Sequence, residues 1–221
     1  MGLRRPRGLA FAHPTEIVEY IEQGAHEAKA SKEWGNKMQL SRKALNARWG
    51  WTSAAAVVSL IILSALDSIL RARTGYGTAD LQGVPTGWGI RTIMDHWTSP
   101  PDSALAGFGL GFDYLFMPLY AAALFYGAIA ACERFAPKPG VRRRIMTLMA
   151  MAPVGGALFD ACENALQMFM LVRGPSDMLA FLTMEATTAK FAGIAVGLVL
   201  SLMEAMALLS ERRKLSKTGG A

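Results

Sequence analysis

Four polar side chains recur at helical spacing inside a long apolar stretch of the sequence. Asp160, Glu163, Asn164 and Gln167 stand at positions i, i+3, i+4 and i+7, so on a helix they share one face. An ionised carboxylate costs about 2.5–3.5 kcal/mol at the centre of a membrane helix and requires partners. Because lipid offers no hydrogen bonds, we expect this face to point into a helical bundle.

Polar residues of the two neighbouring apolar stretches match this face in depth. Counting outward from the short connections before and after the stretch places Asp160 level with Lys190, and Asn164 level with both Thr187 and Asp113. Three helices are therefore predicted to bring one polar cluster together within the membrane. The candidate ligand-binding residues are Asp113, Tyr120, Asp160, Glu163, Asn164, Gln167, Thr187 and Lys190.

Acids outnumber bases in this predicted cluster. With Glu185 counted beside Asp113, Asp160 and Glu163, four carboxylates face Lys190 alone. Some of the acids are then expected to be protonated, or a cation to be bound. Protonated acids would donate to a ligand or act as general acids, whereas carboxylate oxygens would coordinate a hard cation such as Na⁺, Mg²⁺ or Ca²⁺. Two alternatives stay open: a proton or ion path, and a structural ion pair that locks the helices in register.

The sequence assigns no metal ligands and leaves any cofactor unknown. A di-iron bundle would need Glu-x-x-His motifs, and haem would need an intramembrane histidine, but His13, His26 and His96 lie outside the apolar stretches. Cys132 and Cys162 lie on different stretches, which predicts free thiols. The sequence contains no P-loop, G-x-S-x-G or HExxH motif, and the lack of an inverted repeat argues against a standard secondary transporter.

The elements that must position the cluster are four apolar stretches, each about as long as a membrane-spanning helix requires. Hydrophobic residues make up 52% of the 221-residue chain and charged residues only 18%. Short connections make successive stretches antiparallel neighbours, and Gly193 with Gly197 forms a face for close helix contact. The sequence predicts an all-α integral membrane four-helix bundle over residues 51–210, with spans at Trp51–Leu70, Ala104–Cys132, Ile145–Val172 and Leu179–Leu209.

Two further segments flank or interrupt the predicted bundle. Residues 1–50 are predicted to form a cytoplasmic segment with one or two amphipathic helices over Ile17–Met38, which either lie at the membrane interface or dock a partner. In the long Arg71–Pro101 loop, a short helix is predicted between Trp88 and Trp97, with these two tryptophans at the membrane interface or the segment acting as a lid. Residues 211–221 are predicted to form a basic cytoplasmic tail.

Basic residues divide sharply between the two sides of the predicted bundle. Nine lie in the N-terminal segment, five in the 134–144 connection and four in the C-terminal tail, against three in the Arg71–Pro101 loop and one in the 173–178 turn. The positive-inside rule therefore places both termini in the cytoplasm. We expect the net charge of +6 to serve orientation and contact with anionic lipid, and no folded basic domain suggests binding to nucleic acid.

Three motifs along the last three spans resemble a pattern found in uncharacterised bacterial four-helix integral membrane proteins. The chain has DYLFMPLY at 113–120, DACEN at 160–164 and a late lysine at Lys190. The family pattern has D-[LY]-x-F-x-x-x-Y, D-x-x-E-N and a late lysine in the same order. The resemblance covers residues 104–210 and implies that these residues recur together, without implying an activity.

Together these features predict a protein of the bacterial inner (cytoplasmic) membrane that binds or processes a small amphiphile, such as a lipid, quinone or isoprenoid-like molecule. The expected partners are membrane lipids and this ligand. The alternative is an accessory subunit of a larger membrane complex, docking through Ile17–Met38 and the Gly193/Gly197 face. The sequence leaves open whether the protein is an enzyme.

Overall fold

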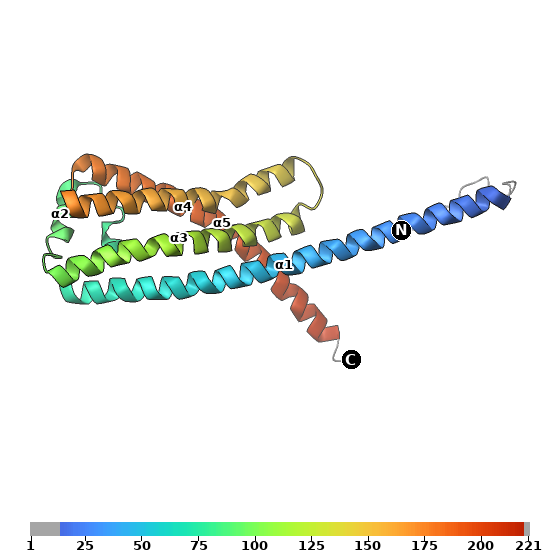
Figure 1. Cartoon of the computed structure of the whole chain (residues 1–221), viewed down its shortest axis with the longest axis horizontal. Coiled ribbons are helices and arrows are strands. Elements are labelled where there is room, and N and C mark those ends of the chain that lie inside the picture. The colour runs from blue at the N-terminus through green and yellow to red at the C-terminus, as the bar shows by residue number, and fades with distance from the viewer. Residues whose placement is uncertain (1–13, 219–221) are drawn as a thin grey trace. The chain divides into compact units, whose positions relative to one another are not determined.

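A computed structural model of the chain describes the backbone of residues 14–218 and the side chains of residues 42–213. The described part is all-helical apart from its loops, which confirms the predicted fold class (Figure 1). The five α-helices of this part are α1 (Pro14–Thr74), α2 (Gly87–Met94), α3 (Pro100–Phe135), α4 (Val141–Arg173) and α5 (Asp177–Thr218), and a 3₁₀ turn, η2, covers Thr78–Leu81.

Four of these helices are long and apolar enough to cross a membrane. The candidate spans are Arg42–Thr74 of α1, the whole of α3 and α4, and Asp177–Arg213 of α5. Each contains one of the apolar stretches predicted from the sequence. The protein is therefore a multi-pass membrane protein whose spans form a four-helix bundle.

The chain divides into two compact units, residues 1–44 and 45–221. Helix α1 runs without a break from Pro14 to Thr74. The predicted amphipathic faces within Ile17–Met38 lie outside the residues whose side chains are described, and the basic tail beyond residue 213 does so too. The packing described below belongs to the second unit.

Helices α4 and α5 approach each other most closely at glycine. A β-carbon added to Gly193 of α5 would lie 2.6 Å from the carbonyl oxygen of Ala152 and 2.9 Å from the α-carbon of Gly156, both on α4. Gly197 lies against Pro153 in the same interface. The glycine face predicted for helix contact is therefore used inside the bundle, and the idea that it docks a partner subunit is wrong because α4 already covers it.

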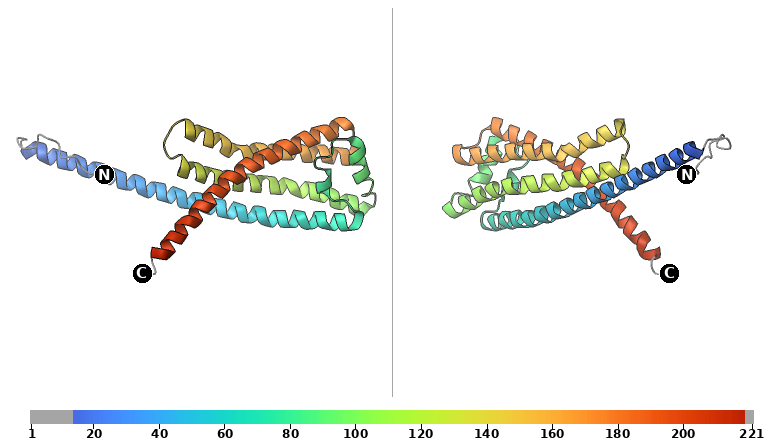
Figure 2. Two further views of the ribbon diagram at one scale, coloured as in Figure 1. Left: turned by 180° about the vertical axis from the view of Figure 1, so that it is seen from behind. Right: turned by 45° about the vertical axis from the view of Figure 1, so that its right-hand side comes forward.

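Helix α1 packs against the bundle along only a narrow line. In its spanning part the buried side chains are Ala56, Ser59 and Leu70, whereas Val57 and Ile61 are more than half exposed. In two views α3 runs alongside α1 on one side and α4 on the other, while α5 crosses them obliquely (Figure 2). An apolar helix exposed in this way is suited to contact with lipid, and its loose packing leaves room beside α3.

The loop between α1 and α3 forms a packed cap over one end of the bundle. Helix α2 confirms the short helix predicted in this loop, and its Ile90 and Ile93 are buried together with Trp97. The expectation that both tryptophans lie at the membrane interface is wrong for Trp97, because its ring fills this core and its Nε1 donates to the carbonyl of Tyr76 at 3.1 Å. Trp88 is 76% exposed.

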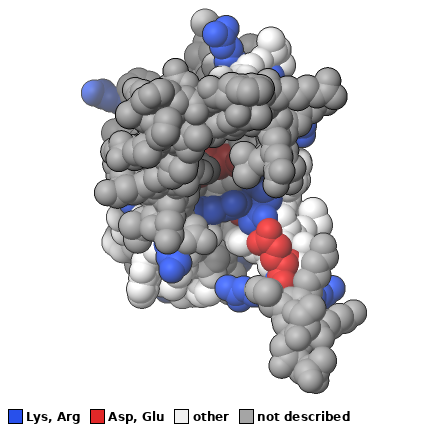
Figure 3. Space-filling model, turned by 90° about the vertical axis from the view of Figure 1, so that its right-hand side faces the viewer, with Lys and Arg blue, Asp and Glu red and all other residues white. Residues whose placement is uncertain are grey.

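At the opposite end an ion-pair network ties α3 to α5. Arg134 donates through Nε and Nη2 to the two carboxylate oxygens of Glu204 at 2.6 and 2.9 Å, and through Nη1 to Glu211 at 2.5 Å. Figure 3 views the molecule from this side and shows acidic and basic side chains next to one another. Because Glu204 is fully buried and paired with a guanidinium in a two-pronged geometry, this contact fixes where α5 leaves the bundle.

Candidate functional site

A buried lysine lies between two carboxylates at the centre of the predicted cluster. Lys190 Nζ of α5 lies 3.1 Å from Asp160 Oδ1 and 2.7 Å from Glu163 Oε2, both on α4. All three side chains are at most 5% exposed. This contact agrees with the register count from the sequence, which set Asp160 level with Lys190, because a three-residue connection leaves two antiparallel helices little freedom to slide.

Two more predicted residues complete the coordination of these carboxylates. Tyr120 of α3 donates its hydroxyl to Asp160 Oδ2 at 2.9 Å, and Gln167 donates its amide to Glu163 Oε1 at 2.8 Å. Each carboxylate is thus held through one oxygen by the ammonium and through the other by a neutral donor. Buried charges need this kind of pairing and hydrogen bonding to be tolerated away from water.

Asp113 forms a second, smaller group beside the lysine. Its Oδ2 accepts a hydrogen bond from Asn164 Nδ2 at 2.8 Å, and the same amide reaches the Leu110 carbonyl at 3.4 Å. Asp113 is half-buried, and its Oδ1 accepts no hydrogen bond from the residues that the structure describes. Thr187, level with this group, is buried and donates to the Thr183 carbonyl of its own helix at 2.9 Å.

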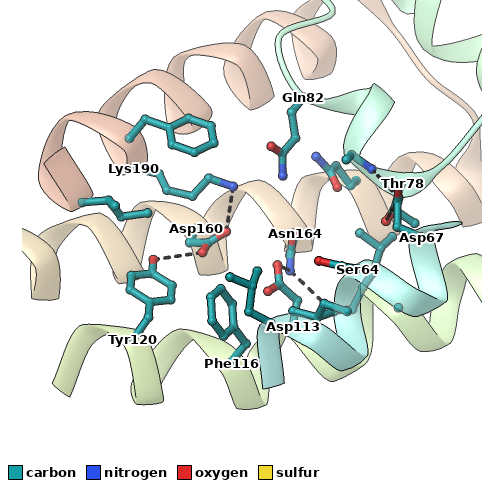
Figure 4. Close-up of a pocket in the computed structure, with 18 of the residues that line it drawn as sticks. Ser64, Asp67, Thr78, Gln82, Asp113, Phe116, Tyr120, Asp160, Asn164 and Lys190 are labelled. Atoms are coloured by element: carbon teal, nitrogen blue, oxygen red, sulfur yellow. Dashed lines mark hydrogen bonds and ion pairs between the residues drawn. The ribbon is translucent and has the colours of Figure 1, made fainter. Parts of the chain in front are cut away.

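A pocket of about 370 Å³ opens directly onto these groups. In Figure 4, Tyr120, Asp160 and Lys190 lie toward one end of the pocket, and Asp67 and Thr78 toward the other end. Asp113, Asn164 and Gln82 lie near its middle. Among the predicted residues, Asp113, Tyr120, Asp160, Asn164, Gln167 and Lys190 line the pocket, whereas Glu163 and Thr187 do not. Glu163 therefore acts on the pocket only through Lys190 and Gln167.

Helix α1 supplies a wall of the pocket that the sequence reasoning missed. Its contributing residues are Leu60, Leu63, Ser64, Asp67 and Ser68. These positions follow i, i+3, i+4, i+7 and i+8, so three polar residues share one helical face of an otherwise apolar span. That stripe is visible in the sequence. The long loop after α1 prevented its depth from being counted against the other helices.

The 3₁₀ turn η2 closes the pocket at the loop end and is tied to α1 through Asp67. Asp67 Oδ1 accepts hydrogen bonds from the Thr78 hydroxyl at 3.1 Å and from the Ala79 amide at 3.0 Å. Arg71, one turn after Asp67, reaches Asp80 of the same turn at 2.9 Å. The end wall of the pocket is therefore held in place by several polar contacts with α1.

Glu185 does not belong to the cluster, contrary to the charge count made from the sequence. Its side chain is exposed and does not line the pocket. Glu185 precedes Lys190 by five residues, which turns its side chain by about 140° around a helix of 3.6 residues per turn. The cluster therefore contains three carboxylates and one ammonium, and the ammonium is paired with Asp160 and Glu163 but not with Asp113. The group would still carry a net charge of −2 if every member were ionised.

The cluster lies deep below the capped end of the bundle. Lys190 follows the start of α5, Asp113 follows the start of α3, and Asp160 precedes the end of α4, each by about 13 residues, or roughly 20 Å at 1.5 Å per residue. No three His, Cys, Asp or Glu side chains come together as ligands for one metal ion within residues 42–213. The site is thus a polar pocket well inside the candidate spans, without a recognisable metal-ligand set among residues 42–213.

Comparisons of this chain with protein families, with curated proteins and with solved structures find no match in any of the three. The geometry of the pocket is therefore the basis on which a function can be inferred.

Proposed function

We propose that this integral membrane protein binds a small amphiphile in the pocket between α1 and the α3–α4–α5 bundle and holds its polar end for recognition or reaction. The observation that carries the proposal is the pocket itself, in which ionised and amide side chains border open space among apolar walls. Its volume of about 370 Å³ lies within the range of small-molecule sites. A lipid, quinone or isoprenoid-like molecule matches this mixture of surfaces.

The placement of the ion pair favours a binding site over a purely structural lock. An ion pair that only locks helices in register needs no open space beside it. Asp160 and Lys190 instead border the cavity, together with Asp113 and Asn164. In the proposed site Asp160 contacts the ligand as a hydrogen-bonding or acid–base group, Lys190 balances its charge with Glu163 behind it, and Asp113 with Asn164 orients the polar end.

The proposed setting is the cytoplasmic membrane of a bacterium, with both termini in the cytoplasm and the pocket in the outer half. The excess of Lys and Arg in the N-terminal segment, in the connection between α3 and α4 and after α5 supports this orientation. A ligand would then enter laterally from the outer leaflet, past the loosely packed α1. We propose no nucleic-acid partner, since the basic residues are distributed as orientation signals.

An accessory-subunit role in a larger membrane complex is the alternative proposal. The glycine face is excluded as its docking surface, so a partner would have to use the exposed apolar side of α1 or the N-terminal segment. The two roles differ in what the polar cluster does, because a subunit needs the cluster only for stability, whereas a binding protein needs it to retain a ligand.

Native mass spectrometry of the protein, gently extracted from its own membrane, tests the proposed function. We expect a defined small-molecule adduct on the wild type and its loss in the double variant Asp160→Asn/Glu163→Gln, which keeps side-chain size while removing charge. Glu185→Gln is the matched control, because it removes a carboxylate from α5 outside the pocket and should leave the adduct in place.

Two results would overturn the proposal. One is a folded wild-type protein that carries no adduct and co-purifies with protein subunits that the double variant also retains. The other is an adduct that persists equally in the wild type, the double variant and the control, since such a molecule would be bound elsewhere on the lipid-facing surface.

A further inference from the structure

Lys190, the one cationic side chain among the described residues that line the pocket, is already paired within the protein, and so are several neutral donors beside it. The ammonium of Lys190 is shared by two carboxylates, the hydroxyl of Tyr120 is given to Asp160, and the amide of Asn164 is given to Asp113. At the loop end the hydroxyl of Thr78 is given to Asp67. An anionic head group entering the pocket would therefore have to break an existing contact to gain a cationic partner.

Among the carboxylates that line the pocket, Asp113 is the one that forms no ion pair with a described residue, since Asp160 pairs with Lys190 and Asp67 with Arg71. Asp113 lines the pocket, and its Oδ1 accepts nothing from the described residues, while its Oδ2 is held by Asn164. This fixed carboxylate has no cation of its own among those residues, since Lys190 lies between Asp160 and Glu163. Within the described part of the chain, Asp113 therefore has both an unpaired negative charge and an oxygen that is available to a ligand.

From this imbalance we infer that the ligand is an ammonium-bearing amphiphile whose cationic head binds Asp113. The inference rests on the proposed function and specifies the chemistry of its ligand. An organic ammonium needs only one carboxylate and a few neighbouring acceptors, so it suits a site in which the described acids do not converge as metal ligands. A bound ammonium group would also reduce the net negative charge of the cluster, which is costly in a medium of low dielectric constant.

The shape of the pocket also orients the chain of such a ligand. Leu60, Phe116, Phe191 and Ile194 are apolar residues of the lining, and Thr78 and Gln82, which lie in or directly after the turn η2, are polar ones. With the ammonium at Asp113 and the rest of the polar head beside Asp160, the hydrocarbon chain lies along these apolar side chains. The polar loop end is left for water or for additional hydrogen-bonding groups of the head.

Photo-crosslinking of the full-length protein in phosphatidylcholine nanodiscs tests this inference. Three probes share a twelve-carbon chain with a diazirine near its end and differ only in the head group, which is an ammonium, a hydroxyl or a phosphate. We expect the ammonium probe to label the pocket saturably, with adducts on peptides containing Leu60 or Phe191–Ile194, and to exceed the phosphate probe at least tenfold. Unlabelled dodecylammonium should compete with it.

Substitution of Asp113 tests whether this carboxylate recognises the ammonium group. Asp113→Asn can still accept the hydrogen bond from Asn164, so the fold is kept while the charge is lost, and the tenfold preference for the ammonium probe should disappear. Glu185→Gln, the matched control, should keep the preference. Adding phosphatidylethanolamine to the nanodiscs identifies the source of the ammonium. If labelling of the wild-type pocket by the ammonium probe is lost, the ligand is a lipid with an ammonium head group. If labelling is retained, the ligand is a free amine, and either result supports the inference.

The possible failures are distinguishable. Equal or stronger saturable labelling of the pocket by the hydroxyl or phosphate probe would overturn the ammonium inference while leaving an amphiphile pocket in place. A preference that survives in Asp113→Asn would likewise overturn the ammonium inference. If none of the three probes labels the pocket in wild-type protein, the proposed function itself fails.

Discussion

Lys190 governs the electrostatics of the buried site at the scale of single residues. Its ammonium is the shared partner of Asp160 and Glu163, and all three groups are almost completely shielded from water. Removing one member of a buried ion pair leaves an uncompensated charge and typically costs about 3–5 kcal/mol, whereas replacing all members by neutral groups of similar shape is often nearly neutral. The stability of the protein should therefore depend on the balance of the group more than on any single charge.

Substitution of the lysine separates these two effects. Lys190→Met leaves two facing carboxylates without their cation, so we expect a loss of about 3–5 kcal/mol in the free energy of unfolding. The triple variant Lys190→Met/Asp160→Asn/Glu163→Gln removes the opposing charges as well and should recover most of the loss. Thermal unfolding in detergent, followed by intrinsic fluorescence, compares the two, and an unfolding temperature of Lys190→Met equal to that of the wild type would contradict this account.

At the scale of helices, the site is built by the close contact of α4 with α5 and the loose contact of α1 with α3. The α4–α5 contact places Asp160 and Glu163 against Lys190, and it requires glycine where the backbones nearly touch. The narrow packing line of α1 leaves the pocket beside it. A tight pair of helices thus holds the charges, while a peripheral helix forms the wall past which a ligand would enter.

The glycine contact gives a prediction with an internal control. Gly193→Ala would place a methyl group 2.6 Å from the Ala152 carbonyl and 2.9 Å from the Gly156 α-carbon, so the helices must separate and the protein should lose stability. Gly155→Ala on α4 meets nothing within 4 Å and should be neutral or stabilising by up to about 1 kcal/mol, because alanine favours a helix. The unfolding temperatures of both variants are compared with that of the wild type in the same detergent. If both substitutions shift the unfolding temperature in the same direction, the glycine contact between α4 and α5 is contradicted.

The helices and much of the polar cluster could be predicted from the sequence, for identifiable physical reasons. Apolar length identifies the spans, and connections of a few residues fix the depth of adjacent helices, which is why the pairs Asp160–Lys190 and Asp113–Asn164 were placed correctly. Depth counting fails across the long loop after α1, so the wall containing Ser64 and Asp67 was missed. Glu185 was misassigned because depth alone was considered, without its angular position on α5.

At the scale of the whole molecule, the two ends of the bundle differ in chemistry. One end is capped by the packed loop around Trp97, and the other is closed by the network of Arg134 with Glu204 and Glu211. In the proposed orientation the first end faces away from the cytoplasm and the second faces it. The pocket then opens in the outer half of the membrane, where an amphiphile of the outer leaflet would reach it.

Cysteine labelling of intact cells tests this orientation. In a background with Cys132 and Cys162 replaced by serine, Trp88→Cys should react with a membrane-impermeant maleimide added outside, because Trp88 is 76% exposed at the capped end. Lys138→Cys, in the connection between α3 and α4, should react only after the cells are permeabilised. The reverse pattern would invert the topology and place the pocket in the cytoplasmic half.

The central claim, that a ligand occupies this pocket, is tested most directly by filling the pocket. Gly109 of α3 lines it, and a β-carbon there would have only Thr78 nearby, at 3.8 Å, so Gly109→Leu projects into the open space. Gly111→Leu makes the same change two residues along α3 at an exposed position with nothing within 4 Å. The measurement is native mass spectrometry of both variants from their own membrane. We predict that the adduct disappears from Gly109→Leu and persists in Gly111→Leu, whereas equal adduct occupancy in the two folded variants would contradict the claim.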